Sequence, residues 1–589
     1  MSQTPSPDPL ELSREKSGDD YSFDGLTGWR KYRVLRPGRG MYHDVKRRLP
    51  YYPSDITDAL TYRVIASTIR MYFVNLLPAI AFTLDMYRRT GEFYGINEAL
   101  FSSALAAMVF SILGAQPLTI VGITGLIGLF NYTIYDIVVI YDASVYPQVM
   151  AWTGIWAAVF HWMVSFWNLC DYMRYVTDFS SQSFGMYVGI IYIIKGVEEL
   201  INEFTYGSRA GFLGCVIAML YFGTIYGLEK LGGSTVFKPW FRGILADYAY
   251  VIGTLFWVGF SHIPGTLKDT DLSYVPVVRA FHPTQPRSWL IDFWNLNATW
   301  VFVSLPFGFL VMLLFYYDHN VSSLTAQARQ YPLKKPGGFH WDFFLLGCTT
   351  FVAGLLGLQL PNGLVPQAPV HTDSLTVYET ELKIISTEEG EGAEIRRPIV
   401  RAVAVVEQRL SHFLMGLAII GTMTGPLLTV LRTMPAAVFA GVFFVVGWGA
   451  IESNGMLEKL IFLMSEDRFI QRDEPLLTIQ KRKIWMWIGI QAVGVAVTVA
   501  ISQTIAAIGF PVLITALIPL RTAVLPKIFS RKELQVMDDL TANSETVLAS
   551  LGGAPTLPEN IRADEYGLER RYSESRRGVS RQRSGSLYQ

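Results

Sequence analysis

The amino-acid sequence predicts an all-α protein that crosses a membrane many times. Of its 589 residues, 51% are hydrophobic and only 17% are charged. Apolar runs of roughly 20 residues, each long enough to cross about 30 Å of hydrocarbon, recur between about residues 63 and 527. The charged residues gather in the two ends of the chain and between these runs. We count about fourteen runs, two of them short and interrupted, so both ends are expected on one side of the membrane.

The two ends of the chain are polar. Residues 1–62 contain several prolines and become basic in their second half, in the stretches GWRKYRVLRPGRG and DVKRRLP. Residues 532–589 form a second polar segment. Basic segments beside a membrane span favour the cytosolic side, where the lipids are anionic. We therefore expect two cytosolic tails, and the first 20 residues lack the apolar stretch of a cleavable signal peptide.

The basic residues between the runs mostly agree with this orientation. Lys481, Arg482 and Lys483 precede the thirteenth run on the side expected to be cytosolic. There are two exceptions on the side expected to be outside: Arg88 and Arg89 after the first run, and a mixed-charge loop from about His262 to Asp292.

Two connecting segments have a pattern of their own. In SNGMLEKLIFLMSEDRFI, Met456, Leu460 and Met464 recur at helical spacing, which predicts an interfacial helix at the cytosolic surface. The segment ETELKIISTEEGEGAEIRR, residues 379–397, is charged and interrupted by glycine. We expect it to form a cytosolic loop.

Two apolar runs are interrupted by helix-breaking residues. The first is LGAQPLTIVGITGLIGLF, residues 113–130, and the second is GLQLPNGLVPQAPVHTDSL, residues 357–375. Their prolines and glycines predict an extended piece followed by a short helix in each, although prolines that merely kink two packed helices are the alternative. Extended backbone at membrane depth must be buried in protein or line a wet cavity. The N-termini of two such half-helices would present unpaired N–H groups that can bind an anion.

These and other stretches resemble the bicarbonate-transporter, or anion-exchanger, superfamily of solute carriers. The resemblance is carried by GAQPLTIVGITG (114–125), PWFRGILADYAYVIGTLFWVGFSHIPG (239–265), YYDHNVSSL (316–324), GGFHWDFFLLG (337–347) and the second interrupted run. Within that superfamily, PNGLVPQAPVHT is similar to the borate-transporter branch of fungi and plants. The resemblance implies a uracil-permease-like fold of fourteen spans in two inverted seven-span repeats, with half-helices at the third and tenth spans meeting mid-membrane.

The resemblance also implies a division into domains and a cellular setting. A core domain would comprise residues 63–172 and 296–430, and a gate domain would comprise residues 173–295, with an outer loop, and residues 431–531. The protein is expected in the plasma membrane, as a homodimer joined through its gate domains.

Six residues are carried over, or added, as the candidate substrate site. Asp318 occupies the place of an acidic residue beside the substrate, where a structural partner or a coupling-ion ligand are alternative roles. Gln367 stands where vertebrate anion exchangers have an arginine, which argues against bicarbonate. Hydroxyls and backbone N–H groups at the starts of the half-helices would bond a polyhydroxy ligand. The full set is Asp318, Gln367, Thr124, Gln116, His371 and Thr372.

The favoured function is secondary transport that exports borate by movement of core against gate. The alternatives are a bicarbonate/chloride exchanger and, less favoured, a membrane anchor for cytoskeletal partners, for which 62 residues before the first run leave little room. We do not expect the protein to be an enzyme or a primary pump, because the sequence lacks the phosphate-loop, metalloprotease and hydrolase motifs G-x-x-x-x-G-K-[ST], H-E-x-x-H and G-x-S-x-G. The three cysteines have no metal-ligand spacing. The expected partners are borate and the lipid bilayer, without nucleic acid, metal or cofactor.

Overall fold

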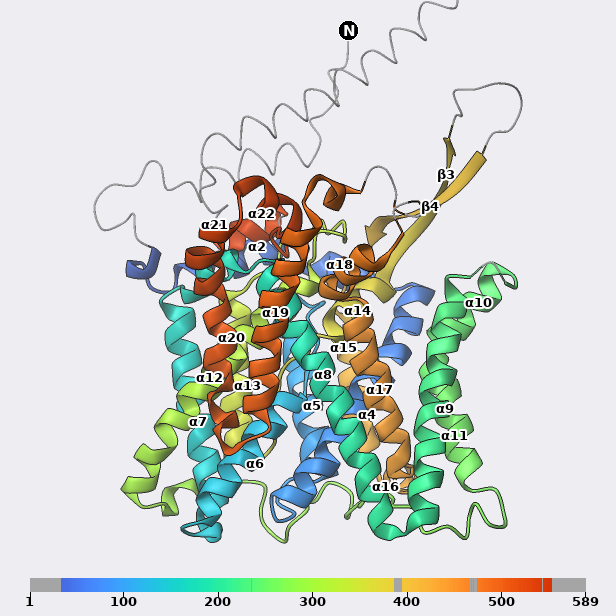
Figure 1. Ribbon diagram of the computed structural model, residues 1–589. Helices are drawn as coiled ribbons and strands as arrows, with labels where there is room; N and C mark the ends of the chain where they lie inside the picture. The colour runs from blue at the N-terminus through green and yellow to red at the C-terminus, as the bar shows by residue number, and fades with distance from the viewer. Residues whose placement is uncertain are drawn as a thin grey trace, which may run out of the picture.

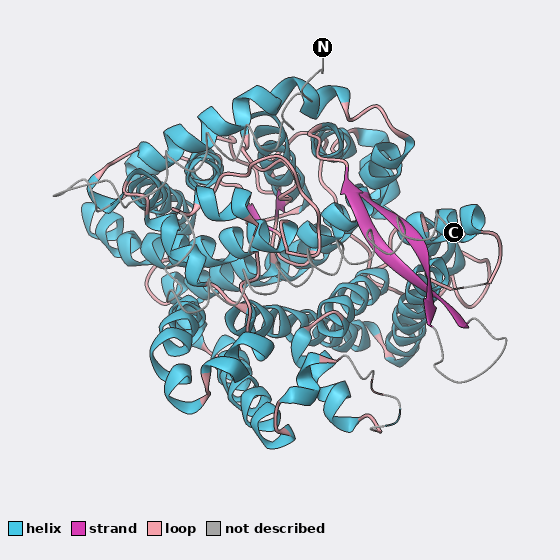
Figure 2. Ribbon diagram, turned by 90° about the horizontal axis from the view of Figure 1, so that it is seen from above, coloured by secondary structure: helices cyan, strands magenta, loops and turns pink. Residues whose placement is uncertain are grey.

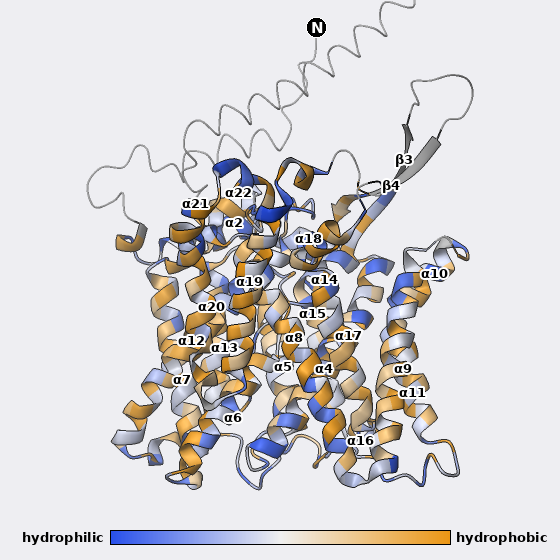
Figure 3. Ribbon diagram, in the orientation of Figure 1, coloured by the Kyte–Doolittle hydropathy of each residue, from blue (hydrophilic) through white to orange (hydrophobic). Residues whose placement is uncertain are grey.

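The structure of the protein is a computed structural model, and it describes residues 33–385 and 395–552 except 235, 467, 469, 471–473 and 543. The parts of the two predicted tails at 1–32 and 553–589 lie outside the described residues. Long helices run roughly side by side from one end of the molecule to the other (Figure 1). Apolar residues cover their middle sections and polar residues gather at both ends (Figure 3). This distribution is that of a protein that spans a membrane.

Eight helices form what we call the first helical group, in which α7 packs on α12 and α13, and α15 packs on α4 and α5. α4 also contacts the two short helices α6 and α14. The members are α4 (Tyr62–Arg89), α5 (Ile96–Leu113), α6 (Gly125–Val139), α7 (Tyr146–Phe166), α12 (Ala298–Ala326), α13 (His340–Leu355), α14 (Gln367–Leu375) and α15 (Leu410–Thr422).

Eight further helices form the second helical group, in which α17 packs on α8 and α9. The members are α8 (Asp178–Glu203), α9 (Ser208–Gly232), α10 (Pro239–Asp247), α11 (Ala249–Ser261), α17 (Ala436–Glu452), α18 (Gly455–Met464), α19 (Lys481–Ser502) and α20 (Phe510–Pro519). The short helix α16 (Gly425–Arg432) lies between α15 and α17 in the chain, at the lower end in Figure 1.

Seven described helices are long and apolar enough to cross a membrane, or up to ten if each of three bent helix pairs counts as one span. The number is below the predicted fourteen partly because α6 and α14 have only 15 and 9 residues. The bent pair α17 and α18 turns by 64°, so the helix predicted from Met456 to Met464 exists as a separate element.

Two short strands connect the interrupted runs. β1 (Val121–Gly122) pairs antiparallel with β2 (Asn362–Gly363), with Val121 opposite Gly363 and Gly122 opposite Asn362. Viewed from above, this pair lies in the interior among the helices (Figure 2). Each strand leads into a short helix, α6 or α14. The predicted arrangement of an extended piece followed by a half-helix is therefore present in both runs.

Residues 379–385 and 395–397 of the predicted loop belong instead to a β-hairpin, and residues 386–394 lie outside the described residues. β3 (Thr376–Ile385) pairs antiparallel with β4 (Ile395–Val405), and the hairpin projects from one end of the bundle, which we call the hairpin end (Figure 1). The loop prediction was wrong for residues 379–385 and 395–397, because it followed the charges and glycines of the whole segment. The β-branched and aliphatic residues on either side form the strands.

The described parts of the two predicted tails are folded against the hairpin end. α2 (Arg39–Arg48) and α3 (Tyr52–Thr57) bury charged residues, and Asp55 accepts hydrogen bonds from Arg48, Arg409 and Lys335 at 2.7, 2.8 and 3.0 Å. The expectation of a plain polar tail therefore does not hold for residues 39–57. Buried side chains join this segment to the bundle.

The segment after α20 also packs on the bundle, and we call residues 531–552 the C-terminal strap. It contains α22 (Arg531–Met537) and α23 (Glu545–Ser550). Asp538 accepts a hydrogen bond from the backbone N–H of Phe179 on α8, and Ser550 donates one to Asp44 on α2. The strap therefore contacts the second helical group and the segment that covers the first, so residues 532–552 are not a free tail.

Candidate functional site

The two half-helices, α6 and α14, begin shortly after the paired strands β1 and β2, in the interior of the first helical group. We call the strand pair and the two helix starts the crossing. Thr124 is the N-cap of α6, and its hydroxyl oxygen accepts a hydrogen bond from the backbone N–H of Ile127 at 3.4 Å. Pro366 precedes α14 at its N-cap position. Two helix N-termini with their partly positive N–H groups thus lie near one another at a short sheet, which is the arrangement that favours an anion.

Asp318 holds the second strand of this crossing. It lies on α12, is 2% exposed, and its Oδ2 accepts a hydrogen bond of 2.7 Å from the side-chain amide of Asn362 in β2. The other amide atom, Asn362 Oδ1, is buried and has no partner among the described residues. A charged carboxylate inside the membrane costs free energy, and such residues are usually paired or functional. Asp318 and Asn362 form a polar pair of this kind beside the crossing. Asn362 lies in the PNGLV stretch, but the sequence did not single it out.

Gln367 begins α14 and faces a large cavity. The cavity has a volume of about 530 Å³ and extends from the hairpin end to Gln367, between α4, α12 and α14 on one side and α8, α17 and α18 on the other. The side-chain oxygen of Gln367 is buried and has no partner among the described residues. Tyr192 on α8 lies within reach of the Gln367 side chain. A buried amide oxygen of this kind can accept a hydrogen bond from a ligand hydroxyl.

The guanidinium groups that line the cavity are engaged with carboxylates of the same lining. Arg70 pairs with Glu229 and Arg329 pairs with Asp178, each at 3.0 Å. Among the described residues that line the cavity, the amide of Gln367 and the N-terminus of α14 are therefore the groups best placed to receive a small oxyanion. This arrangement differs from a site built around a free arginine.

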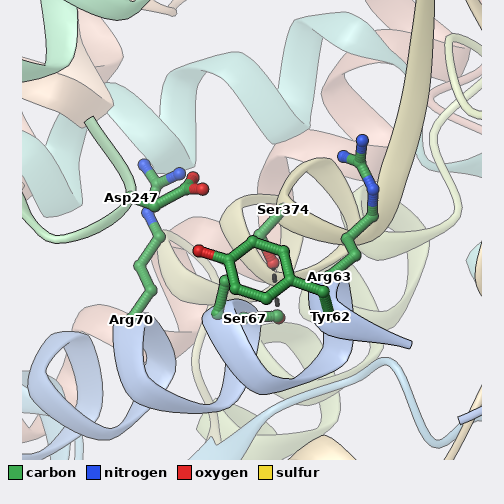
Figure 4. Close-up of a pocket in the computed structure, with 7 residues that line it drawn as sticks. Tyr62, Arg63, Ser67, Arg70, Asp247 and Ser374 are labelled. Atoms are coloured by element: carbon green, nitrogen blue, oxygen red, sulfur yellow. Dashed lines mark hydrogen bonds between the residues drawn. The ribbon is translucent and has the colours of Figure 1, made fainter. Parts of the chain in front are cut away.

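A smaller cavity of about 120 Å³ opens beside Arg70, between the start of α4, α14 and the end of α10. Figure 4 shows Arg70 next to Asp247, with Arg63 on the other side of the Tyr62 ring. Arg63 donates a hydrogen bond of 2.6 Å to the carbonyl of Thr376. Since its two cations already have acceptors, we place the candidate substrate site in the larger cavity.

His371 and Thr372 were expected at the start of the second half-helix, and this placement is wrong. α14 begins at Gln367, so both lie in its second turn. The ring of His371 contacts the carbonyl of Leu118 at 2.9 Å and the hydroxyl of Ser411 at 2.7 Å, and Thr372 donates to the carbonyl of Ala326. These contacts tie α14 to its neighbours and make both residues positioning groups.

Gln116 also lies away from the large cavity. Its backbone N–H donates to Asp342 on α13 at 2.9 Å, and its side-chain oxygen accepts from the backbone N–H of Leu118. It stabilises the extended segment that leads to β1. Of the six predicted residues, Gln367 lines the large cavity, Asp318 and Thr124 lie beside β2 and at the start of α6, and Gln116, His371 and Thr372 contact the surrounding elements.

Comparison with known proteins decides which family this architecture represents. A model of the HCO3- transporter integral membrane domain matches residues 36–210 and 204–542. The chain belongs to the HCO3- transporter family. It is therefore a membrane anion transporter and not an enzyme, and the resemblance found in the sequence is confirmed.

Relatives within this family include fungal and animal proteins. Boron transporter 1 of Saccharomyces cerevisiae is 40% identical over 572 residues, which cover 94% of each chain. A Schizosaccharomyces pombe protein is 42% identical over 504 residues, covering 85% of this chain and 96% of its own. Band 3 anion transport protein of mouse is 27% identical over 565 residues, which cover 90% of this chain and 58% of the mouse protein.

A solved structure shares the fold of this HCO3- transporter family member. The murine solute carrier 26 family member A9 aligns with a TM-score of 0.52 at 11% sequence identity, over 90% of this chain and 76% of that one. The similarity shows the fold alone. It supports an all-α, multi-span membrane architecture with bent helix pairs.

Proposed function

We propose that the protein exports borate across the plasma membrane as a secondary transporter. The observation that carries this proposal is Gln367, a neutral hydrogen-bonding side chain at the N-terminus of α14, facing the large cavity. A neutral amide suits a ligand that presents several hydroxyl groups. The similarity to a fungal boron transporter over 94% of both chains supports the same substrate. Outward movement of the anion would lower internal boron, since boric acid enters cells as the neutral form.

The proposed mechanism is movement of one helical group against the other. We assign the first helical group to a core domain, residues 63–172 and 296–430, and the second to a gate domain, residues 173–295 and 431–531. The cavity between the groups supports this division, because it gives Gln367 access to the hairpin end. Asp318, Thr124 and Gln367 would move together with the core.

We further propose fourteen spans in two inverted repeats of seven. The chain order supports this count, because α4, α5, α6, α7, α8, α9 and α11 can be matched with α12, α13, α14, α15, α17, α19 and α20. In both series the third member is a half-helix that follows a short strand. Antiparallel pairing of β1 with β2 is what two repeats of opposite orientation would give.

The hairpin end is proposed to face the cytosol, with both ends of the chain on that side. α2, the hairpin and α22 all lie at this end (Figure 1), and the basic residues Lys481, Arg482 and Lys483 begin α19 there. A homodimer through the gate domains remains part of the proposal, with the exposed apolar face of α9 as one surface available for it.

A bicarbonate/chloride exchanger is the second candidate function. It is favoured by the family's own description and by the 27% identity to Band 3. It is disfavoured by Gln367, because the cavity offers no lining arginine that is without a carboxylate partner among the described residues.

One experiment separates the two functions. Cells with and without the protein are loaded with boric acid, and intracellular boron is measured together with the recovery of internal pH driven by bicarbonate. We expect lower boron in cells that contain the protein and unchanged pH recovery. Rapid bicarbonate-for-chloride exchange without any effect on boron would overturn the borate assignment.

A further inference from the structure

The first and second helical groups are joined by charged residues at the end opposite to the hairpin. Arg88 of α4 pairs with Glu199 of α8 at 2.6 Å, and Asp85 of α4 pairs with Lys195 of α8 at 3.0 Å. The side chains of Lys195 and Glu199 are each only 5% exposed. Their partners Arg88 and Asp85 are 36% and 19% exposed, and Lys195 also pairs with Glu198 of its own helix at 2.7 Å. Removing Arg88 leaves the buried carboxylate of Glu199 without this partner, which destabilises the joined arrangement of the two groups.

An aromatic cluster lies one turn closer to the cavity. Phe82 of α4 contacts Tyr192 of α8 and Phe443 of α17, with ring centroids 4.9 and 4.8 Å apart, and all three rings are buried. Contacts between α4 and α8 thus recur at every turn, from Phe82 with Tyr192 to the two ion pairs. Together they close the space between the two groups on this side of Gln367.

The same helices are separated at the hairpin end. Val74 of α4 and Gly185 of α8 both line the large cavity. From Val74 to Asp85 is eleven residues, or about 16 Å along the helix. Over this distance the facing sides of α4 and α8 change from lining the cavity to direct side-chain contact, and the large cavity reaches Gln367 from the hairpin end.

We propose that Asp85, Arg88, Lys195 and Glu199 form a latch that keeps the outer side closed while the substrate site opens to the cytosol. The proposal rests on the function proposed above, in which the core moves against the gate. In each cycle the latch must open before the site can face outward. This role accounts for the position of Arg88 on the outer side, although basic residues usually favour the cytosolic side.

A third basic residue nearby provides a matched control. Arg89 pairs with Asp136 of α6 at 3.6 Å and lies over the ring of Tyr132, also on α6. Both partners belong to the first helical group, so these contacts do not cross the interface. Arg89→Gln removes a charge next to the latch without removing a link between the groups.

The test measures how often the cavity is open to the cytosol. Val446 lines the cavity and is replaced by cysteine in a chain that carries Cys215→Ser and Cys348→Ser. A membrane-impermeant maleimide is applied to the cytosolic side of membrane vesicles, and the rate of labelling is recorded. The readout needs no substrate, so a failure to transport boron would overturn the proposed function without deciding this test.

Removing either ion pair, with Arg88→Gln or Lys195→Gln, should slow the labelling by roughly twofold or more, because the outward-facing state gains population. The exchange of charges in the double variant Arg88→Glu with Glu199→Arg should restore the rate, and Arg89→Gln should not change it. If a variant is not delivered to the membrane, the nearly isosteric Glu199→Gln replaces it. Labelling at the original rate in all neutral latch variants, or an equal decrease in Arg89→Gln, would refute the latch.

Discussion

Replacement of Asp318 by asparagine tests the polar pair at the crossing of the two half-helices. The change keeps the size of the side chain and removes its charge. Asn362 can still donate its hydrogen bond, now to the amide oxygen of the new side chain, which lies at the same place as the carboxylate oxygen at 2.7 Å. We therefore expect normal amounts of protein in the membrane and a strong decrease in transport.

The magnitude follows from the hydrogen bond itself. A bond to a charged acceptor contributes about 1.5–3 kcal/mol, and one between neutral groups contributes about 0.5–1.5 kcal/mol. The hydrogen bond to Asn362 is therefore weaker by about 1–1.5 kcal/mol. This difference lowers the equilibrium constant that favours the observed position of β2, and of the start of α14, by a factor of roughly five to thirteen. If the carboxylate also receives a hydrogen bond from the substrate, a second factor of similar size applies.

The assay is transport of boric acid by purified protein in vesicles, at several substrate concentrations. Asp318→Asn should lower the rate at low substrate at least about fivefold. Asp318→Ala is the harsher comparison, because it leaves the amide of Asn362 without its acceptor and should also lower thermal stability by about 1–3 kcal/mol. A normal rate and a normal half-saturating concentration for Asp318→Asn would remove this residue from the site.

Three further predictions concern other parts of the molecule. Gln367→Ala should raise the half-saturating substrate concentration at least about fivefold, since the lost hydrogen bond costs about 1–3 kcal/mol, and equal values in concentration series of the two proteins would contradict this. Asp55→Asn should lower the free energy of unfolding by about 3–5 kcal/mol, visible in thermal unfolding of detergent-solubilised protein, because buried cations lose their shared carboxylate. Burial tends to raise the pKa of Asp44, but hydrogen bonds and charge from its neighbours outweigh it and hold the pKa below the ordinary value. Asp44 therefore stabilises the fold at pH values above its ordinary pKa, and this stabilisation is lost as the pH falls below that pKa. In a plot of the free energy of unfolding against pH, Asp44→Asn should make the decrease at acid pH less steep.

Much of the site was readable from the sequence because proline and glycine act locally. Pro117, Gly122 and Pro361 disfavour a continuous helix, so the two extended pieces could be expected from the chain itself. The rule is not absolute, because Pro78 and Pro306 lie inside the continuous helices α4 and α12. The pairing of Asp318 with Asn362 is different. It joins residues 44 positions apart, and only the folded chain decides which amide reaches the carboxylate.

Residues that tie elements together were the ones that sequence reasoning misassigned. His371 was expected to be a ligand because it lies in the second interrupted run, near the expected start of its half-helix, yet its partners Leu118 and Ser411 are distant in the chain. Glu199 was not singled out in the sequence, because an acidic residue near a helix end is usually solvated, yet Arg88 reaches it across the interface between the two groups. In both cases the partner is supplied by tertiary structure, which residue spacing does not encode.

The link between the first and last described segments has a consequence for how the protein is made. Asp44 and Ser550 are 506 residues apart, and their hydrogen bond joins α2 to the strap. At a synthesis rate of about 5–20 residues per second, Asp44 waits roughly 25–100 s before its partner leaves the ribosome. During that time the carboxylate lacks this donor. The contacts of the strap at the hairpin end thus form only after the last membrane helix has been synthesised. A chain truncated before Ser550 would lack the hydrogen bond to Asp44.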